Sequence, residues 1–584
     1  MKKINVKDID IDSLDVIINK AGRVVDGINH GRMVLKGDGI YYKIFDKDYC
    51  RRENFIRALE CGFFDGLSPT LQSLIEDEGE IVGYVSKAGT PLGSEFDEIP
   101  KEFYERVLDK AKDTKMFFYD LVASNVIRTE SGEISLIDLE SVYNLDELHT
   151  INKHNATVKP DYYLKELDKL WEKHMDSRII SFIQPSRNNL KYLKWSYNSI
   201  RKNLGYRHEI CWADDFSDDG TWEWMQEMAE KDKNIKIHRN EGPKRLGHTI
   251  LYDTLVDMAT SDIVMIYHAD MYACPDMDEE VLRHLQRGKV VSATRIEPPL
   301  HPDGPEKILV DFGIEPEEFD ERGLMSWLES NPNVSKNVGR TTEGIFAPWA
   351  IYKDDFLAIG GHDPLYAPQS KEDSDIFNRF VLNEYELIQT WKGFVYHMTC
   401  RGSRFADGAQ RNPDGQVFMK NRETDEWLKQ NVRSTRNFIR KWGHMVQHDE
   451  MMMPIIPPKY DIGFVVENCG LEHLSALEPW CSDIYGDWVG HKGFHVNKYI
   501  EEEQPNTDFS LSKKIHTQHS EPINDVVVYI DCSKLNNNNF QMLTQLSEIL
   551  EEQGEIGEFE LDEFTVNVKD LDTYEKTLII CKTK

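Results

Sequence analysis

The stretch SDIVMIYHADMYACP, residues 261–275, decides the fold of the central part of this chain. Residues 263–267 are almost entirely apolar and rich in β-branched and aromatic side chains, which predicts a strand buried on both faces of a mostly parallel sheet. His268 and Asp270 follow, two positions apart, so their side chains leave the same side of an extended chain. Because ligands of open α/β sheets bind beyond the carboxyl ends of the strands, this pattern predicts a site for one divalent ion. The alternative is a solvated polar turn after a core strand.

Strands and helices are predicted to alternate before this stretch. Apolar runs that indicate strands lie within residues 178–189, 208–215 and 233–240, and helical periodicity lies within residues 189–205 and 247–259. Such alternation at short intervals is typical of a doubly wound, nucleotide-binding α/β layer.

The order of motifs in this region resembles the GT-A fold of family-2 glycosyltransferases. The chain has PSRN at 185–188, ADDFSDDGT at 213–221 and HAD at 268–270, where the family has Pro-x-x-Asn, Asp-Asp-x-Ser-x-Asp-Gly-Thr and Asp-x-Asp, each after a strand. The resemblance implies that the nucleotide-sugar contacts the residues at these strand ends, namely Pro185, Arg187, Asp214 and Asp215. His268 departs from the family's Asp, and a mixed imidazole and carboxylate set shifts the expected ion from Mg²⁺ toward Mn²⁺.

The resemblance continues downstream and implies the catalytic groups. GGHD at 360–363, EDSD at 372–375 and His397 occur in the family's order. Asp373 is then the base that deprotonates the acceptor hydroxyl, with a pKa that burial beside Glu372 must raise, and His397 is the third metal ligand. Alternatively, Glu372 and Asp373 are acidic residues that complement the dipole at a helix start, and His397 is a structural histidine.

The same resemblance implies donor, acceptor and stereochemistry. Three arginines are candidates to contact a diphosphate: Arg245, Arg401 and Arg404. The reaction expected is a single displacement with inversion, from a nucleotide-sugar, with a UDP-sugar favoured, to a glycan or a lipid-linked sugar.

The N-terminal part resembles the protein-kinase-like fold of the lipopolysaccharide and small-molecule kinases. Lys43 on a strand, Glu53 on the next helix, Asp120, Asn125 and Asp138 match that fold in type and order, and Lys43 is expected to pair with Glu53. The chain departs from protein kinases in having no GxGxxG before Lys43 and Leu-Glu after Asp138. Phosphotransfer from ATP is the second hypothesis, either as the only activity or beside glycosyl transfer in a bifunctional enzyme. The alternatives are a degenerate kinase-like module in this part of the chain and an inactive binding scaffold for the whole protein.

The length of 584 residues predicts several domains, since one domain takes roughly 100–200 residues. We expect an α/β multidomain protein with a kinase-like α+β domain at 1–175, a central Rossmann-like GT-A domain at 176–450 and a small α/β domain of unknown role at 451–584. The aromatic segment 477–495 of the last domain is expected to be exposed, for acceptor recognition or for contact with a second copy in a homo-oligomer.

Charge and cysteine usage narrow the class of protein. The chain has 102 acidic and 69 basic residues, a formal charge of −33, which disfavours general nucleic-acid binding. Its nine scattered cysteines form no CxxC pair and indicate reduced thiols. No apolar run approaches the ~20 residues of a membrane span, and residues 1–20 lack a signal-peptide core, so a cytoplasmic protein is expected.

Overall fold

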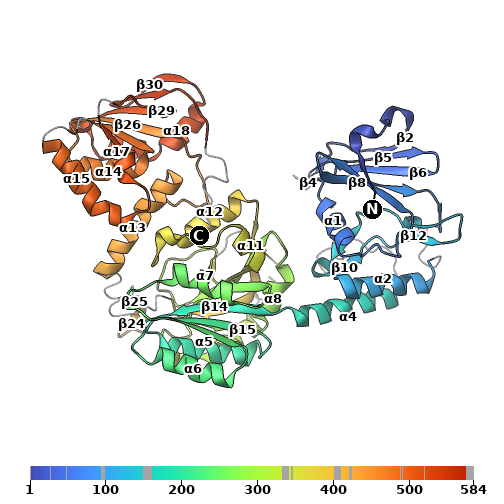
Figure 1. Ribbon diagram of the computed structural model, residues 1–584. Coiled ribbons are helices and arrows are strands. Elements are labelled where there is room, and N and C mark those ends of the chain that lie inside the picture. The colour runs from blue at the N-terminus through green and yellow to red at the C-terminus, as the bar shows by residue number, and fades with distance from the viewer. Residues whose placement is uncertain are drawn as a thin grey trace. The chain divides into compact units, whose positions relative to one another are not determined.

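The computed structural model (Figure 1) divides into two compact units, Met1–Arg178 and Ile179–Lys584, and each is described by itself. The structure describes residues 2–25, 28–47, 49–93, 99–148, 161–331, 341–342, 346–399, 409–419, 424–486, 488, 491–517 and 520–573. The boundary expected after residue 175 falls near the end of helix α4 (Asp161–Ser177), close to the division between the units.

The first unit is built on a six-stranded sheet with the order β1-β7-β8-β6-β5-β2. Its strands are β1 (Lys2–Asn5), β2 (Asp15–Asn19), β5 (Arg32–Gly37), β6 (Ile40–Phe45), β7 (Leu71–Asp77) and β8 (Glu80–Lys87). The shorter strands are β3 (Val24–Val25), β4 (Ile28–Asn29), β9 (Thr90–Pro91), β10 (Met116–Phe118), β11 (Val126–Arg128), β12 (Ile134–Leu136) and β13 (Val142–Asn144). Helices α1 (Arg52–Glu60), α2 (Lys101–Thr114) and α4 complete the unit, whose core is rich in buried phenylalanine and tyrosine.

Lys43 lies on β6 and is 6 % exposed, but its partners differ from the expected one. Its ammonium lies 2.7 Å from Asp138 Oδ1 and 2.8 Å from Glu140 Oε1. The predicted pair between Lys43 and Glu53 is wrong, because Glu53 is exposed on α1 while the buried Glu140 lies beside the ammonium. A second carboxylate after the strand, rather than one on the helix, therefore neutralises this lysine.

Asp120 and Asn125, the other two residues of the kinase-like resemblance, contact one another. Asn125 Nδ2 donates to Asp120 Oδ2 at 2.8 Å and to the Asp120 carbonyl at 3.0 Å. The five predicted residues thus fall into two contacting pairs, Lys43 with Asp138 and Asp120 with Asn125, and Glu53 stands apart.

The second unit contains a ten-stranded sheet whose main path is β16-β15-β14-β17-β22-β19-β23-β18. Its strands are β14 (Ile180–Ser186), β15 (Glu209–Asp215), β16 (Ile235–Asn240), β17 (Ile263–Ile266), β18 (Met271–Ala273), β19 (Lys289–Glu297), β20 (Lys307–Leu309), β21 (Thr341–Thr342), β22 (Trp349–Tyr352) and β23 (Glu386–His397). The strand predicted from the apolar run is confirmed as β17, and all its residues are buried.

Strands β16, β15, β14 and β17 run parallel, whereas β22 is antiparallel to both β17 and β19. The chain steps outward from β14 to β16 and then returns to the other side of β14. The carboxyl ends of β14 and β17 therefore flank a topological switch point, which is where an open α/β sheet offers a ligand crevice.

Helices cover both faces of this sheet. α5 (Leu190–Asn203) and α6 (Thr221–Lys231) lie on one face and α7 (His248–Met258) lies on the other (Figure 1), which agrees with the predicted doubly wound layer. The unit also contains α8 (Met277–His284), α9 (Glu321–Ser330), α11 (Lys353–Ala358), α12 (Glu372–Leu382), α13 (Asp425–Trp442) and the hairpin of β24 (Ala409–Arg411) and β25 (Val417–Met419).

The C-terminal part of the second unit has its own six-stranded sheet, in the order β28-β27-β26-β29-β31-β30. The strands are β26 (Ile462–Glu467), β27 (Asp483–Gly486), β28 (Ile515–Thr517), β29 (Val526–Asp531), β30 (Gly557–Leu561) and β31 (Phe564–Val568). The helices are α14 (Leu471–Leu477), α15 (His491–Glu503), α16 (Leu511–Lys514), α17 (Asn537–Thr544) and α18 (Leu546–Gln553).

One sequence prediction for this part differs from the structure. The expected exposure of segment 477–495 is wrong for Trp480 and Tyr485, which are 9 % and 2 % exposed because both pack into the domain. Helices α17 and α18 are separate, since Gln545 leaves helical geometry between them. Across the described ranges, no helix combines the length and the apolar composition that crossing a membrane requires.

Candidate active site

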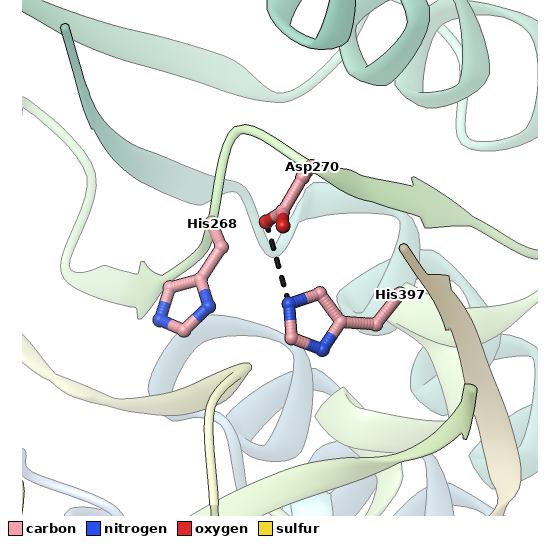
Figure 2. Close-up of side chains that lie close together, drawn as sticks. All are labelled: His268, Asp270 and His397. Atoms are coloured by element: carbon pink, nitrogen blue, oxygen red, sulfur yellow. Dashed lines mark ion pairs between the residues drawn. The ribbon is translucent and has the colours of Figure 1, made fainter. Parts of the chain in front are cut away.

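His268, Asp270 and His397 point toward one another (Figure 2), and one ligand atom from each lies within 4.8 Å of the others. His268 follows β17, and Asp270 immediately precedes β18. His397 is the last residue of β23, which pairs antiparallel with β18 so that His397 stands opposite Met271. This register explains how a histidine far downstream in the sequence reaches Asp270.

Glu297 contacts His397 on the ring nitrogen that faces away from Asp270, and the sequence analysis did not predict this residue. It ends β19, whose parallel pairing with β23 sets the preceding residue, Ile296, opposite Tyr396. Glu297 Oε1 lies 2.7 Å from His397 Nδ1, while His397 Nε2 lies 3.3 Å from Asp270 Oδ1. The carboxylate thus engages one ring nitrogen and leaves the other to face the cluster, as outer partners of metal-binding histidines do.

Burial disfavours charge on both imidazoles, with different outcomes. Burial, assisted by the charge of His397, lowers the pKa of His268 to about 3, so this ring is neutral. In His397 the carboxylates of Asp270 and Glu297 outweigh burial and raise the pKa to about 9. Burial also opposes the charge of Glu297, but Arg295, at 3.2 Å, and His397 hold the pKa of Glu297 well below its usual range.

The donor set of this cluster fits a divalent cation. It offers two imidazoles and one carboxylate, and imidazole nitrogen together with carboxylate oxygen suits Mn²⁺. Binding would displace the proton of His397, because a metal ligand must be deprotonated.

A second acidic group lies at the start of α12. Glu372 is 6 % exposed, and its Oε1 lies 2.5 Å from Nε2 of His248, the first residue of α7. Burial opposes the charge of Glu372, but His248 lowers the pKa of Glu372 below its usual value. Burial and then the charge of Glu372 raise the pKa of the half-buried Asp373 to about 6. A carboxyl group with that pKa is a stronger base than an ordinary aspartate and is still mostly ionised at neutral pH.

His248 was also missed in the sequence. A histidine at a helix start is an ordinary pattern, and only the fold shows that the starts of α7 and α12 meet.

One cavity of about 1350 Å³ reaches both groups. Nine of the residues predicted from the sequence line it: Pro185, Arg187, Asp215, Arg245, His268, Asp270, Glu372, Asp373 and His397. Asp214, in contrast, is fully buried and is not among the described residues that line this cavity. Its carboxylate accepts a hydrogen bond from Ser217 N at 3.3 Å. Arg401 and Arg404 lie outside the described residues.

The Asp215 carboxylate accepts several hydrogen bonds from other groups of the protein. It accepts hydrogen bonds from the backbone N–H groups of Leu246 and Gly247 at 3.0 and 2.9 Å, and from Asn240 Nδ2 at 2.7 Å. These bonds fix the turn that carries Arg245, whose Nη2 donates to Gln369 Oε1 at 2.9 Å. Asp215 therefore shapes the cavity wall as well as facing the cavity.

Comparison with known families supports the motif assignment. Residues 181–319 match the family model described as glycosyl transferase family 2. The matched segment includes the strand ends that carry Pro185, Asp215 and His268. The match ends before Glu372, Asp373 and His397. No curated protein matches the chain.

Several solved structures resemble part of the chain. GalNAc-T7 with UDP, GalNAc and Mn²⁺ aligns at 13 % identity and TM-score 0.31, over 45 % of this chain and 48 % of that one. TarS 1-349 of S. aureus with UDP aligns at 17 % identity and TM-score 0.26, over 37 % of this chain and 59 % of that one. The mannosyltransferase PcManGT of Pyrobaculum calidifontis with GDP-Man and Mn²⁺ aligns at 18 % identity and TM-score 0.27, over 39 % of this chain and 58 % of that one. The alignments span less than two thirds of each of these proteins.

Proposed function

We propose that the second unit is a metal-dependent glycosyltransferase that moves a sugar from a nucleotide-sugar, with a UDP-sugar favoured, to a hydroxyl group of a glycan or a lipid-linked sugar. The observation that carries this proposal is that the cation-binding cluster and the Glu372–Asp373 pair open onto one cavity. A cation site and a base with a raised pKa in one cavity are the two groups that an inverting displacement requires.

The donor half of the site uses the carboxyl ends of β14, β15 and β17. His268, Asp270 and His397 would hold Mn²⁺ or Mg²⁺, and that ion supplies charge neutralisation for the departing nucleotide diphosphate. Arg187 and Arg245 line the same cavity and provide further positive charge for the phosphates. Pro185 and Asp215, at the ends of β14 and β15, are the residues for the base and ribose.

Asp373 is the base in this proposal. It takes the proton of the acceptor hydroxyl while that oxygen forms a bond to the anomeric carbon. The bond from the same carbon to the diphosphate oxygen breaks and its electron pair leaves with the nucleotide, so the anomeric configuration inverts. Glu372, held by His248, keeps a negative charge next to Asp373 and so strengthens Asp373 as a base.

The size of the cavity supports two ligands. Pockets for one small molecule usually span roughly 300–1,000 Å³, and the volume here, about 1350 Å³, is larger. The wall beyond Asp373 comes from α13 and residues 446–454, including Trp427, a ring on which a sugar can stack. We assign that end to the acceptor.

Turnover of a donor panel tests the proposal. The full chain with Mn²⁺ should release nucleotide from at least one UDP-, GDP- or TDP-sugar, faster when the right glycan is added. Asp270→Ala should remove both turnover and Mn²⁺ binding, whereas Asp373→Asn should keep Mn²⁺ binding and lose roughly 10²- to 10⁴-fold in turnover. Intact donors across the panel, or full activity in Asp373→Asn, would refute it.

A phosphotransferase in the first unit is the second candidate, and the contact between Lys43 and Asp138 favours it. A lysine that binds phosphates and an aspartate that binds a metal ion must lie close together in a kinase-like site, and these side chains are 2.7 Å apart. Asp138→Ala distinguishes the sites: it should abolish any ATP-dependent phosphotransfer and leave nucleotide-sugar turnover unchanged. Release of ADP that persists in Asp138→Ala would exclude this role.

A further inference from the structure

Helix α13 contacts two parts of the second unit at once. On one side it contacts the segment 367–373, here called the base turn, which ends in Glu372 and Asp373. On the other side it contacts residues 460–573, here called the C-terminal domain. We propose that Asn431 and Arg433 of α13 are positioning residues for Asp373, and that the C-terminal domain serves the reaction by holding α13. The role of Asp373 as a base rests on the proposed function.

The base turn has a backbone that needs support from outside. Ser370 and Lys371 both have positive φ angles, 81° and 72°, and such angles are costly for residues other than glycine unless the surroundings enforce them. Both side chains reach the same atom of α13. Ser370 Oγ donates to Asn431 Oδ1 at 2.7 Å, and Lys371 Nζ lies 3.3 Å from that oxygen. One amide oxygen therefore fixes the two strained residues directly before Glu372.

Two neighbours of Asn431 extend this support along the turn. Arg433 Nη1 donates to the carbonyl oxygen of Ala367 at 2.6 Å. Ser434 Oγ donates to the carbonyl oxygen of Gln369 at 3.1 Å. α13 thus contacts the base turn along residues 367–371.

The opposite side of α13 is fixed by the C-terminal domain. Arg433 Nε donates to the carbonyl oxygen of Asn506 at 3.0 Å, so one guanidinium joins the base turn to that domain. Arg436 Nη1 donates to the carbonyl oxygen of Ser475 at 2.7 Å, and Arg436 Nε donates to Glu503 Oε1 at 2.8 Å. These contacts give the domain a direct connection to the residues before Asp373.

Packing alone does not fix the half of α13 that meets the base turn. Leu428 and Val432, in that half, are 41 % and 58 % exposed, whereas Phe438 and Trp442 in the other half are buried. The polar contacts of Asn431, Arg433 and Ser434 therefore contribute to holding this half to the turn. A displacement of about 1 Å at a catalytic group can cost on the order of 10²-fold in rate, so a loosened turn should be visible in kcat.

Three variants of the full chain test the role of Asn431. Asn431→Ala removes the acceptor, Asn431→Asp keeps an oxygen acceptor at the same place, and Lys429→Ala is the control, since Lys429 is an exposed residue of the same helix. Hydrogen exchange of the ligand-free protein should show the amides of residues 369–373 exchanging at least about ten-fold faster in Asn431→Ala. Asn431→Asp and Lys429→Ala should exchange like the wild type.

With an active donor, Asn431→Ala should lower kcat roughly ten- to a hundred-fold, with the donor KM and the Mn²⁺ affinity unchanged. The exchange measurement needs no substrate. The positioning role can therefore fail while the proposed function stands, and the proposed function can fail while the positioning role stands. Unchanged exchange of residues 369–373 in Asn431→Ala would overturn the positioning role. A raised donor KM with unchanged kcat would instead make Asn431 a substrate contact and would also overturn it.

Arg436→Leu tests the part played by the C-terminal domain, because Arg436 contacts that domain through Ser475 and Glu503. If the domain holds α13 for the reaction, this variant should speed exchange at residues 369–373 and lower kcat, although the hydrogen bonds of Arg436 run to the C-terminal domain and not to the turn. Faster exchange confined to residues 475–506, with wild-type kcat, would show that the domain does not position the base.

Discussion

Glu297 and His397 end two neighbouring parallel strands, and their side chains meet at 2.7 Å between Oε1 and Nδ1. The contact turns Nε2 of His397 toward Asp270, and Arg295 keeps Glu297 charged. A buried carboxylate outside the candidate cluster of His268, Asp270 and His397 therefore sets the orientation of one of its histidines. The same strand pairing that builds the sheet thus also builds the outer layer of the site.

Glu297→Gln should weaken Mn²⁺ binding by roughly 10- to 100-fold, because the neutral amide orients His397 less strongly and supplies less negative charge. Isothermal titration calorimetry of the donor-free protein with MnCl₂ measures the change. Glu450→Gln is the matched control, since it removes an exposed carboxylate that lines the same cavity without touching the cluster. Equal Mn²⁺ affinities in the two variants would show that Glu297 does not support the metal site.

The acid limb of the pH–rate profile should report Asp373. Its pKa is raised to about 6 by burial and by Glu372, and a base must be deprotonated to act. The value of kcat/KM is therefore expected to be level above about pH 7 and to fall about ten-fold per pH unit well below pH 6. Initial rates between pH 4.5 and 8, in buffers matched for ionic strength and saturating in metal, measure this. A profile that stays level down to pH 5 would contradict Asp373 as the base.

Asp373→Asn should stabilise the protein at neutral pH. The folded pKa, about 6, is above the unfolded value of roughly 3.9, so the ionised side chain costs stability as pH rises from 4 through 6. The variant should gain about 1–2 kcal/mol at pH 7.5 and only a fraction of that at pH 4, where the folded carboxyl group is protonated and the unfolded one is about half protonated. Urea unfolding at the two pH values provides the comparison. An equal effect at both would mean that the cost does not come from the charge.

The sequence predicted the elements that carry local signals. The apolar run 263–267, the helical periodicity within residues 189–205 and 247–259, and the strand predicted within residues 208–215 each depend on a few neighbouring residues, and they appear in the structure as β17, α5, α7 and β15. The partners of these elements could not be predicted, because they depend on strand order. Glu297 meets His397 only through the pairing of β19 with β23, and His248 meets Glu372 only because α7 and α12 start together.

Charge pairing in the first unit shows the same limit. The spacing of residue types matched a known pattern, yet Lys43 contacts Glu140 instead of Glu53. Both acids are compatible with the sequence, and burial decides between them: a lysine that is 6 % exposed needs a partner that is equally buried. Burial is a property of the fold that the residue pattern of this chain does not reveal.

Glu478→Gln should strongly destabilise the second unit. Glu478 is fully buried, with Arg440 Nη2 at 2.6 Å and Lys514 Nζ at 2.8 Å from its carboxylate oxygens. Burial opposes its charge, but Lys514 and Arg440 hold the pKa of Glu478 well below its usual range. Removing the acid takes a carboxylate partner from Lys514 and leaves Arg440 with Glu503 alone, which costs about 3–5 kcal/mol.

The sign of the pH effect gives an internal check on that prediction. A lowered folded pKa stabilises the protein above the unfolded value of roughly 4.3 and loses this effect as pH falls below it, so the difference between Glu478→Gln and the wild type should shrink toward pH 3. The control is Glu552→Gln, an exposed acid that is expected to change stability by less than about 0.5 kcal/mol. Urea unfolding followed by tryptophan fluorescence at pH 7 and pH 3 measures both variants. If Glu478→Gln unfolds like Glu552→Gln at pH 7, the buried cluster around Glu478 does not stabilise the unit.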